Sequence, residues 1–311
     1  MIDVTGVTKR YKSYLAVSDL SLNVPQGEIF GFLGPNGAGK TTTIRMLSGL
    51  LLPTAGEGVV GGVSLHDRQQ LKRVIGLMPE SQGYYGYMTP LEYLGFFGRL
   101  YEVPAAKLRT RIGSLLETVG LTYAARRPVG QFSRGMRQRL GLARTIIHEP
   151  RVVFLDEPSL GLDPQGQREM QQMIRQINTE WQVTVFLSSH LLGEVAQLCH
   201  RVAIMRQGEV LASGQPEALS RELGQGARAH IDVGDIAKAA VVCGEEGIAI
   251  LERDGQRLTV ALGADHEALP RLLARLVAAG VAIYGAVPQT ATLEEVFLNV
   301  MQSPAERAVS A

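Results

Sequence analysis

The chain has 311 residues, of which 45% are hydrophobic and 20% are charged. This length and composition are typical of a folded protein with one large domain and a smaller second one, and they exclude an intrinsically disordered chain. The formal net charge is only +1, so no overall positive field favours nucleic acid, and we expect no nucleic-acid partner. The two cysteines belong to no metal-binding motif, and no apolar run reaches the roughly 20 residues that a membrane-spanning helix needs.

The N-terminal part of the chain alternates short apolar runs with helical patterns. Strand-like alternation covers residues 2–8 and 16–24, and a buried strand over 28–33 leads into a glycine-rich loop and a helix over 41–50. Further apolar runs predict buried strands at 74–78, 152–155 and 183–187. Because short apolar strands alternate with helices, the sequence predicts a parallel α/β sheet with helices on both faces.

Long helical patterns dominate residues 89–148, which predicts a helical insertion in this α/β domain. A second unit is expected to begin near Gly224-Gln225-Gly226, and its order of elements is β-α-β-β-α-β, typical of a small ferredoxin-like domain. We expect the tail after Ser303 to be frayed. The strands of the second unit are predicted at 228–233, 248–253, 258–262 and 282–287, and its helices at 236–243, 266–279 and 293–301.

The glycine-rich loop matches G-x4-G-K-[ST] at every position. It reads Gly34-Pro35-Asn36-Gly37-Ala38-Gly39-Lys40-Thr41 and lies between an apolar strand and a helix, which is the context that this motif requires. Glycines let successive backbone N–H groups turn towards a phosphate, and the start of the helix adds partial positive charge. Lys40 is suited to neutralise phosphate oxygens and Thr41 to give a hydroxyl to Mg²⁺. The loop therefore predicts a nucleotide site rather than a chance turn.

An acidic pair follows the buried strand at 152–155. Open α/β sheets bind ligands at the carboxyl ends of their strands, which is where Asp156 emerges. We expect Asp156 to hold Mg²⁺ through its water shell and Glu157 to polarise the attacking water. Alone, Asp156-Glu157-Pro158 would be a polar turn that ends a strand, but the complete phosphate loop upstream favours the catalytic interpretation.

Ser133 precedes a strong helical pattern and is suited to cap that helix. A helix N-terminus with a free hydroxyl and a glycine is also suited to bind phosphate. The segment Phe132-Ser133-Arg134-Gly135-Met136 resembles the LSGGQ signature of the ABC ATPases. Phe132, Arg134 and Met136 depart from that pattern, whereas Ser133 and Gly135 keep the hydroxyl and the close backbone approach. We expect Arg134 to point to solvent rather than towards a γ-phosphate.

Three more segments resemble parts of the same family, in the order that the family has. Tyr11 resembles the aromatic residue that stacks on adenine, with a tyrosine that only packs as the alternative. Leu160-Gly161-Leu162-Asp163 resembles the D-loop, which in the family crosses the dimer interface, and Asp163 before Pro164 would also cap a helix. His190 follows a buried strand and resembles the switch histidine that contacts the γ-phosphate, whereas a lone histidine is more often structural.

The family usually has a glutamine after the strand that ends here at Met78, and this sequence departs from that pattern. Pro79 is followed by Glu80, and a glutamine appears only at Gln82. The exporter subgroup that this sequence resembles often has a glutamate there, and this resemblance assigns the role of that glutamine to Glu80. A carboxylate is a good ligand of a hard cation, so the contact with Mg²⁺ would be kept. The segment 80–97 is rich in tyrosine, and we expect it to receive helices of membrane subunits.

The resemblance covers residues 1–220 and implies the α/β fold of a P-loop NTPase core, the ABC ATPase core, with an N-terminal antiparallel β layer and a helical subdomain over about 88–148. The nucleotide-binding domain then spans 1–222, and a small C-terminal α+β accessory or dimerisation domain spans 223–311. The closing segment, residues 292–298, resembles a subgroup of exporter ATPases related to antibiotic-resistance pumps.

The activity that the resemblance implies is ATP hydrolysis that powers transport, with a lean to export. The partners would be a second copy, or a second ATPase subunit in a heterodimer, and integral membrane permease subunits, with the chain bound peripherally on the cytoplasmic side of the cell membrane. An alternative is a soluble ABC ATPase that acts on the ribosome or on DNA.

The implied cofactors are ATP and Mg²⁺, and the resemblance divides the site residues by role. Glu157, His190 and Lys40 would act in catalysis. Mg²⁺ would contact Thr41, Glu80 and Asp156. ATP would contact Tyr11, Gly34, Pro35, Asn36, Gly37, Ala38, Gly39, Lys40, Thr41, Thr42, Ser133, Gly135 and Asp163.

Overall fold

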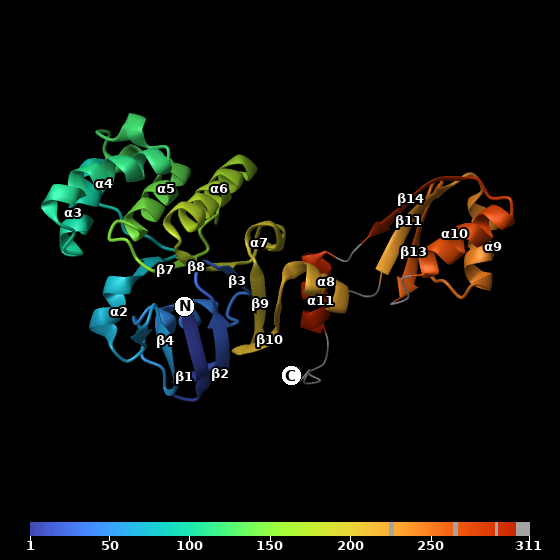
Figure 1. The fold of residues 1–311 in the computed structure, drawn as a ribbon, viewed down its shortest axis with the longest axis horizontal. Helices are drawn as coiled ribbons and strands as arrows, with labels where there is room; N and C mark the ends of the chain where they lie inside the picture. Colours follow the sequence, from blue (N-terminus) through green and yellow to red (C-terminus); the bar gives the residue numbers. More distant parts are fainter. Residues whose placement is uncertain (224–226, 264–266, 290–291, 303–311) are drawn as a thin grey trace. The chain divides into compact units, whose positions relative to one another are not determined.

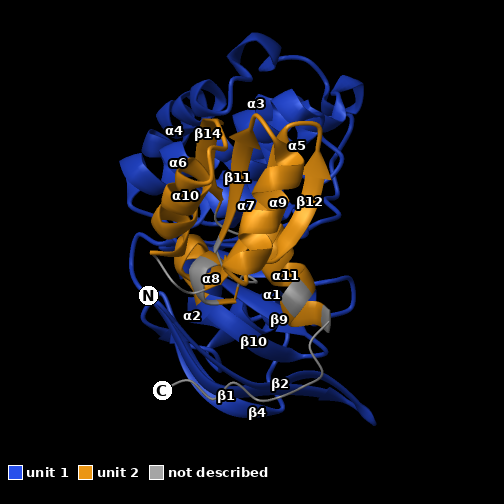
Figure 2. Cartoon of the chain, turned by 90° about the vertical axis from the view of Figure 1, so that its right-hand side faces the viewer, with its two compact units in different colours: residues 1–213 blue, residues 214–311 orange. Residues whose placement is uncertain are grey.

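The computed structural model describes residues 1–223, 227–263, 267–289 and 292–302, and the chain forms two compact units, residues 1–213 and 214–311 (Figures 1 and 2). Each unit has sheets and a hydrophobic core of its own. The turn Gly224-Gln225-Gly226, the first expected helical residue His266 and the tail from Ser303 lie outside the described residues.

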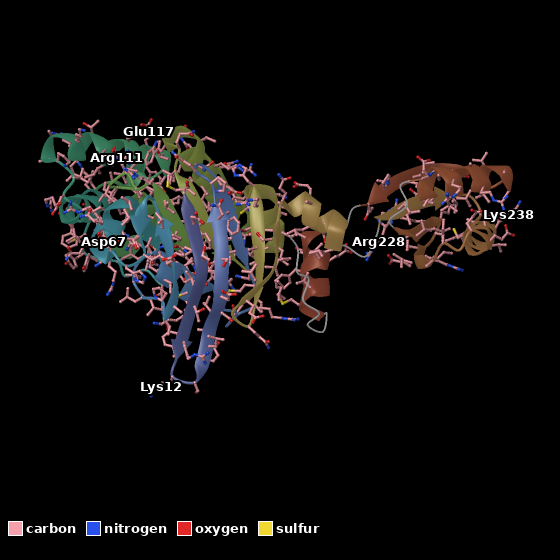
Figure 3. The ribbon with its side chains drawn as sticks, turned by 60° about the horizontal axis from the view of Figure 1, so that its bottom comes forward. Lys12, Asp67, Arg111, Glu117, Arg228 and Lys238 are labelled. Atoms are coloured by element: carbon pink, nitrogen blue, oxygen red, sulfur yellow. The ribbon has the colours of Figure 1, made fainter. Side chains whose placement is uncertain are left out.

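An antiparallel sheet with the order β2-β1-β4-β5 forms the N-terminal layer of the first unit. β1 pairs with β2 and with β4, and a hairpin places Tyr11 opposite Tyr14. Its turn contains Lys12, labelled in Figure 3, whose φ of 53° lies in the left-handed region. The strands are β1 (Ile2–Tyr11), β2 (Tyr14–Val24), β4 (Ala55–Val60) and β5 (Val63–Ser64).

A second, six-stranded sheet has the order β10-β9-β3-β8-β7-β6. The five strands from β9 to β6 in this order are parallel, so their carboxyl ends meet at one edge of the sheet. Every residue of β3, β7 and β8 is buried, which explains why these strands are continuous apolar runs in the sequence. The strands are β3 (Ile29–Leu33), β6 (Ile75–Met78), β7 (Val152–Asp156), β8 (Thr184–Ser189), β9 (Arg201–Arg206) and β10 (Glu209–Gly214).

Three helices, α3, α4 and α5, pack on one another within the predicted helical insertion (Figure 1). Thr89 begins α3 with a capping box, because its hydroxyl accepts from the backbone of Glu92 and the Glu92 carboxylate accepts from the backbone of Thr89. The helices of the first unit are α1 (Lys40–Leu47), α2 (Arg68–Val74), α3 (Pro90–Leu100), α4 (Ala105–Thr118), α5 (Arg134–Thr145), α6 (Pro164–Trp181) and α7 (Leu192–Leu198), with short 3₁₀ turns η1 (Thr122–Ala124) and η2 (Val129–Gln131).

The second unit contains a four-stranded antiparallel sheet with the order β12-β13-β11-β14. Alternate residues of β11 and β13 join α9 and α10 in one buried cluster, so both helices cover the same face of the sheet. Helix α8 packs against α11. The elements are α8 (Pro216–Leu223), β11 (Ala227–Val233), α9 (Ile236–Glu245), β12 (Ile250–Asp254), β13 (Arg257–Gly263), α10 (Ala268–Ala278), β14 (Ile283–Gln289) and α11 (Leu293–Gln302).

Within the part of the chain that the structure describes, no helix combines the length and the apolar character needed to cross a bilayer.

Candidate functional site

A cavity of about 700 Å³ opens at the carboxyl edge of the six-stranded sheet. It brings together five segments that are far apart in the sequence, namely the β1–β2 hairpin, the loop after β3, the loop after β6, the end of β7 and the loop after β8. The candidate site residues that line it are Tyr11, Pro35, Asn36, Gly37, Gly39, Lys40, Thr41, Thr42, Glu80, Asp156, Glu157 and His190. Leu160, the first residue of the segment that resembles the D-loop, also lines it, as do Tyr14 and Ala16.

The glycine-rich loop forms the floor of this cavity. Gly37 and Gly39 have φ angles of 80° and 112°, which side chains rarely tolerate. A Cβ at Gly39 would lie 2.6 Å from the carbonyl oxygen of Ala16, and one at Gly34 would lie 2.5 Å from that of Met205. Gly39 caps α1 without a side-chain hydrogen bond, so the first N–H groups of the helix stay available to an anion.

Lys40 is the buried cation of the site, with 7% of its surface exposed. Its Nζ donates to the carbonyl oxygens of Gly34 and Pro35, over 2.7 and 3.2 Å. Burial lowers the pKa of Lys40, and this effect is opposed by the carboxylates of Glu157, Asp156 and Glu80. All three carboxylates line the same cavity as this ammonium, and such a set of charges suits a metal ion and a polyphosphate.

Asp156 is held at the end of β7 by a neighbouring strand. The hydroxyl of Ser188 donates to Oδ1 of Asp156 over 2.6 Å, and Oγ1 of Thr41 lies 3.5 Å from the same oxygen. A hydroxyl and carboxylates, all oxygen donors, suit Mg²⁺, so the residues present fit this cofactor. Ser188 was not singled out from the sequence, because a serine inside a buried strand carries no signal of its own.

Glu157 sits in a strained backbone conformation with φ of 52°. Its N–H is within hydrogen-bond distance of the hydroxyl and the carbonyl oxygen of Ser188, at 3.2 and 3.1 Å. Its carboxylate is almost buried, and Oε2 lies 2.7 Å from Nδ1 of His190. Backbone and side chain are therefore both fixed, which suits a group that must orient a water molecule.

A further carboxyl group, that of Glu194, lies near this pair. Burial raises the pKa of Glu194, and the hydroxyl of Ser159 opposes that shift.

Both aromatic residues of the β1–β2 hairpin line the cavity. Tyr11 is 43% exposed and Tyr14 is 59% exposed. Nζ of Lys9 lies 5.4 Å from the ring centroid of Tyr11, so that ring face already contacts a cation. Tyr14 presents a second ring at the same opening, and sequence reasoning missed it because it depends on the hairpin register.

The segment that resembles the signature lies outside this cavity, and of the segment that resembles the D-loop only Leu160 lines it. Ser133 caps α5 by accepting from the N–H of Met136 at 3.2 Å, and Asp163 caps α6 by accepting from the N–H of Gly166 at 2.9 Å. A Cβ at Gly135 would lie 3.7 Å from Cδ2 of Leu162, so the two segments are neighbours. The structure thus does not bring Ser133, Gly135 and Asp163 to the nucleotide cavity of the same chain.

Arg134 is exposed, and its guanidinium lies against the backbone of Gly161 in the D-loop segment. A Cβ at Gly161 would lie 2.4 Å from Cζ of Arg134, and Gly161 has φ of 71°. The guanidinium is therefore not simply free in solvent, as the sequence suggested, because it also covers a neighbouring loop.

A second cavity of about 740 Å³ lies between the core and the helical insertion. Apolar side chains from β6, from the end of α3 and from the loop after α1 line it. Leu50 of that loop is 51% exposed and Leu100 of α3 is 65% exposed. Its lining includes Leu50, Ile75, Leu77, Pro79, Phe97, Leu100, Tyr101 and the cations Lys72, Arg73 and Arg144.

Comparisons with known proteins support one family. A family model described as ABC transporter matches residues 17–160. The bacitracin transport ATP-binding protein BcrA of Bacillus licheniformis is 42% identical over 212 residues, which is 68% of this chain and 68% of that protein. The daunorubicin resistance ATP-binding protein DrrA3 of Streptomyces coeruleorubidus is 36% identical over 303 residues, 96% of this chain and 95% of that protein.

Among solved structures, the dimeric post-hydrolysis state of an ATP-binding cassette bound to ADP and Pi is 25% identical, with a TM-score of 0.63, and covers 69% of this chain and 98% of that one. These matches confirm the P-loop ATPase fold of the first unit and favour the transporter subunit over an ATPase of the ribosome or DNA. The chain therefore belongs to the family of ABC transporter ATP-binding proteins and is an ATPase subunit of that kind.

Proposed function

We propose that this chain hydrolyses Mg-ATP between two copies of itself and so powers export through separate membrane subunits. The observation that carries this proposal is the division of the phosphate-facing groups. Lys40, Asp156 and Glu157 share one cavity, whereas Ser133 and Asp163 lie outside it on their own helix caps. Two copies related by a two-fold axis would bring the signature residues of each chain to the open cavity of the other.

Each group of the cavity has a role that follows from its position. The N–H groups of the loop 34–41 and Lys40 would bind the β- and γ-phosphates, and one of the cavity tyrosines would stack on adenine. Thr41, Asp156 and Glu80 would hold Mg²⁺, which neutralises the charge that develops on the phosphates. Glu157 would accept a proton from the attacking water, and His190, at 2.7 Å, would hold its carboxylate in place and contact the γ-phosphate.

The second cavity is suited to receive a helix of a membrane subunit. It offers exposed apolar side chains, Leu50, Leu100 and Tyr101 among them, with cations at its rim. The tyrosines of segment 80–97, which the sequence favoured for this role, mostly pack on one another, as Tyr84 and Tyr93 do at a centroid distance of 5.8 Å. Phe97 is the residue of that segment that lines the cavity.

We take residues 1–222 as the nucleotide-binding domain and 223–311 as an accessory domain. The strand order β12-β13-β11-β14 with two helices on one face supports a ferredoxin-like fold for the latter. The export direction is supported by two relatives, which are named for bacitracin transport and for daunorubicin resistance. Such a subunit would act at the cytoplasmic face of the membrane, as a homodimer or with a second ATPase subunit.

The test is nucleotide-driven self-association of a hydrolysis-deficient chain. Purified Glu157→Gln protein should become a dimer with Mg-ATP and remain a monomer with Mg-ADP, measured by light scattering after size exclusion. The Lys40→Ala/Glu157→Gln double variant is the matched control, because it lacks the phosphate-binding cation and should stay monomeric. A Glu157→Gln chain that stays monomeric in saturating Mg-ATP contradicts the proposed function.

A further inference from the structure

Arg134 is a charged residue within the signature segment, at a position where the ABC ATPase signature has a glycine. It is exposed in the first turn of α5, between Ser133 and Gly135. Among the residues that the structure describes, its guanidinium takes part in no hydrogen bond and in no ion pair. A guanidinium has five N–H donors and a full positive charge, so Arg134 has an unused capacity to bind an anion.

The guanidinium is unpaired, but it has a defined position. It lies against the backbone of Gly161 in the D-loop segment, where a Cβ would be 2.4 Å from Cζ and 2.5 Å from Nη1 of Arg134. Gly161 has φ of 71°, a conformation that favours glycine. The bare backbone at position 161 therefore makes room for the guanidinium, and this contact uses none of its N–H groups as hydrogen-bond donors.

Positive charge gathers at the start of α5. Arg134 and Arg137 line a small cavity of about 310 Å³ there, and Glu80 is the acidic residue that lines it with them. Among the described residues, no ion pair joins Glu80 to either arginine. The surface around the signature segment therefore carries a positive charge that this chain does not neutralise by itself.

Dimerisation would change the surroundings of this charge. In the proposed dimer, Ser133 faces the γ-phosphate of the ATP that the other copy binds, and Arg134 is its neighbour in the chain. The second copy then removes water from the guanidinium. A guanidinium that loses water without gaining an anion strongly disfavours association. The anion that the other copy brings to the signature segment is the γ-phosphate, which ADP lacks.

We propose that Arg134 binds the γ-phosphate of the ATP held by the other copy, and that Gly161 holds its guanidinium in place for this contact. The inference rests on the proposed ATP-dependent dimer and names a residue that favours ATP over ADP in it. The charge-assisted hydrogen bond also stabilises the negative charge that develops on the phosphates during hydrolysis. A dimer with a two-fold axis contains two such contacts.

Dimerisation of the Glu157→Gln parent with Mg-ATP tests this contact without turnover. Arg134→Gln removes the charge, and it should weaken dimerisation by about 100-fold, or about tenfold for each of the two contacts. The loss should be smaller at high salt, because salt screens the charged contact of the parent. Binding of a fluorescent ATP analogue to the monomer in EDTA should change by less than about twofold, since Arg134 does not line the nucleotide cavity of its own chain.

A double-mutant cycle tests whether Gly161 holds the guanidinium. In the parent, Gly161→Ala should weaken dimerisation, because the added Cβ displaces Arg134. In an Arg134→Gly chain it displaces nothing, so the same change should have a smaller effect, which measures the backbone strain at φ of 71°. Equal losses in the two backgrounds would overturn the role of Gly161.

Arg109→Gln is the matched control for the loss of an exposed arginine. Arg109 lies in α4 of the same helical insertion, is exposed, and is in no ion pair with another described residue. This variant should dimerise like the parent at each salt concentration. The melting temperature of Arg134→Gln should also stay near that of the parent, because no hydrogen bond within the described chain is lost.

The outcomes separate this inference from the proposed function. A parent that does not dimerise with Mg-ATP contradicts the proposed function. If the parent dimerises and Arg134→Gln dimerises equally well or more tightly, the phosphate contact is overturned and the dimer stays in place. The same holds if Arg134→Gln weakens dimerisation by the same factor at low and at high salt, because that loss would not come from a charge.

Discussion

The nucleotide cavity and the signature segment differ in how many partners their polar side chains have within one chain. In the cavity, Lys40, Asp156 and Glu157 are buried and are held by Gly34, Ser188 and His190. In the signature segment, Ser133 caps its own helix and is exposed. A capping serine accepts a hydrogen bond and still has its own O–H to donate, so the cap leaves room for a second role. The cavity can therefore be understood from a single chain, whereas the phosphate contact that we propose for the signature segment needs a second copy.

The largest expected effect comes from a variant that disables the cavity and leaves the signature segment unchanged. Glu157→Gln should slow hydrolysis by roughly 10²- to 10⁴-fold, because the amide cannot accept the proton of the attacking water. Nucleotide affinity should remain, since glutamine is of similar size and Lys40 is untouched. Phosphate release and binding of a fluorescent analogue measure the two effects. His190→Ala should cause a smaller loss, and hydrolysis at the parent rate in Glu157→Gln would show that another base acts.

The signature segment can be tested without damaging its structural role. Ser133→Asp and Ser133→Asn both keep an N-cap of similar strength, so the melting temperature of each should stay near that of the parent. A carboxylate facing the γ-phosphate of the other copy costs several kcal/mol, so Ser133→Asp should reduce ATP hydrolysis by about 100-fold. Ser133→Asn should reduce it less. Equal activity of the two variants would mean that this position does not face phosphate.

A smaller effect is expected from replacing either tyrosine of the β1–β2 hairpin, and it would decide which of the two rings stacks on adenine. Loss of one base-stacking ring removes about 1–3 kcal/mol of binding. Replacing the tyrosine that stacks on adenine by Ala should therefore raise KM for ATP about tenfold and leave kcat little changed. We expect this from Tyr11→Ala, because Lys9 already orders its ring. Tyr14→Ala is the matched control, and a larger KM increase in Tyr14→Ala would reverse the assignment.

The smallest expected effect is a pH dependence of the protein's stability. It arises at His148, which belongs neither to the nucleotide cavity nor to the signature segment. Burial lowers the pKa of His148, opposed by its hydrogen bond with the carbonyl oxygen of Ile75, and Arg111 lowers it further. The unfolded chain then binds more protons than the folded chain below the ordinary histidine pKa of about 6.5. Stability should therefore fall as pH decreases from 7 through this range. The melting temperature of His148→Gln should depend less on pH there, whereas the exposed His66→Gln should behave like the parent.

Local sequence was enough for the phosphate loop and for the buried strands around it. Gly37, Gly39 and Lys40 are contiguous, and their backbone requirements are met within one loop. β3, β7 and β8 were predicted within a residue or two because strands buried on both faces are continuous apolar runs. The strand β4 was not predicted, because its residues Ala55–Val60 include two glycines and are mostly exposed, which leaves no alternation to detect.

Only the tertiary structure decided which side chains meet. The parallel register that pairs Asp156 with Ser188 gives the carboxylate its hydroxyl partner, and the hairpin register places Tyr14 beside the same cavity as Tyr11. The structure also separated Glu80, in the cavity, from Gln82, which rests on Gly141. Spacing along the chain could not distinguish these two, because contacts between residues distant in sequence depend on how strands and helices pack. The sequence alone thus determined the nucleotide-binding chemistry of this protein, and packing decided which neighbours orient it.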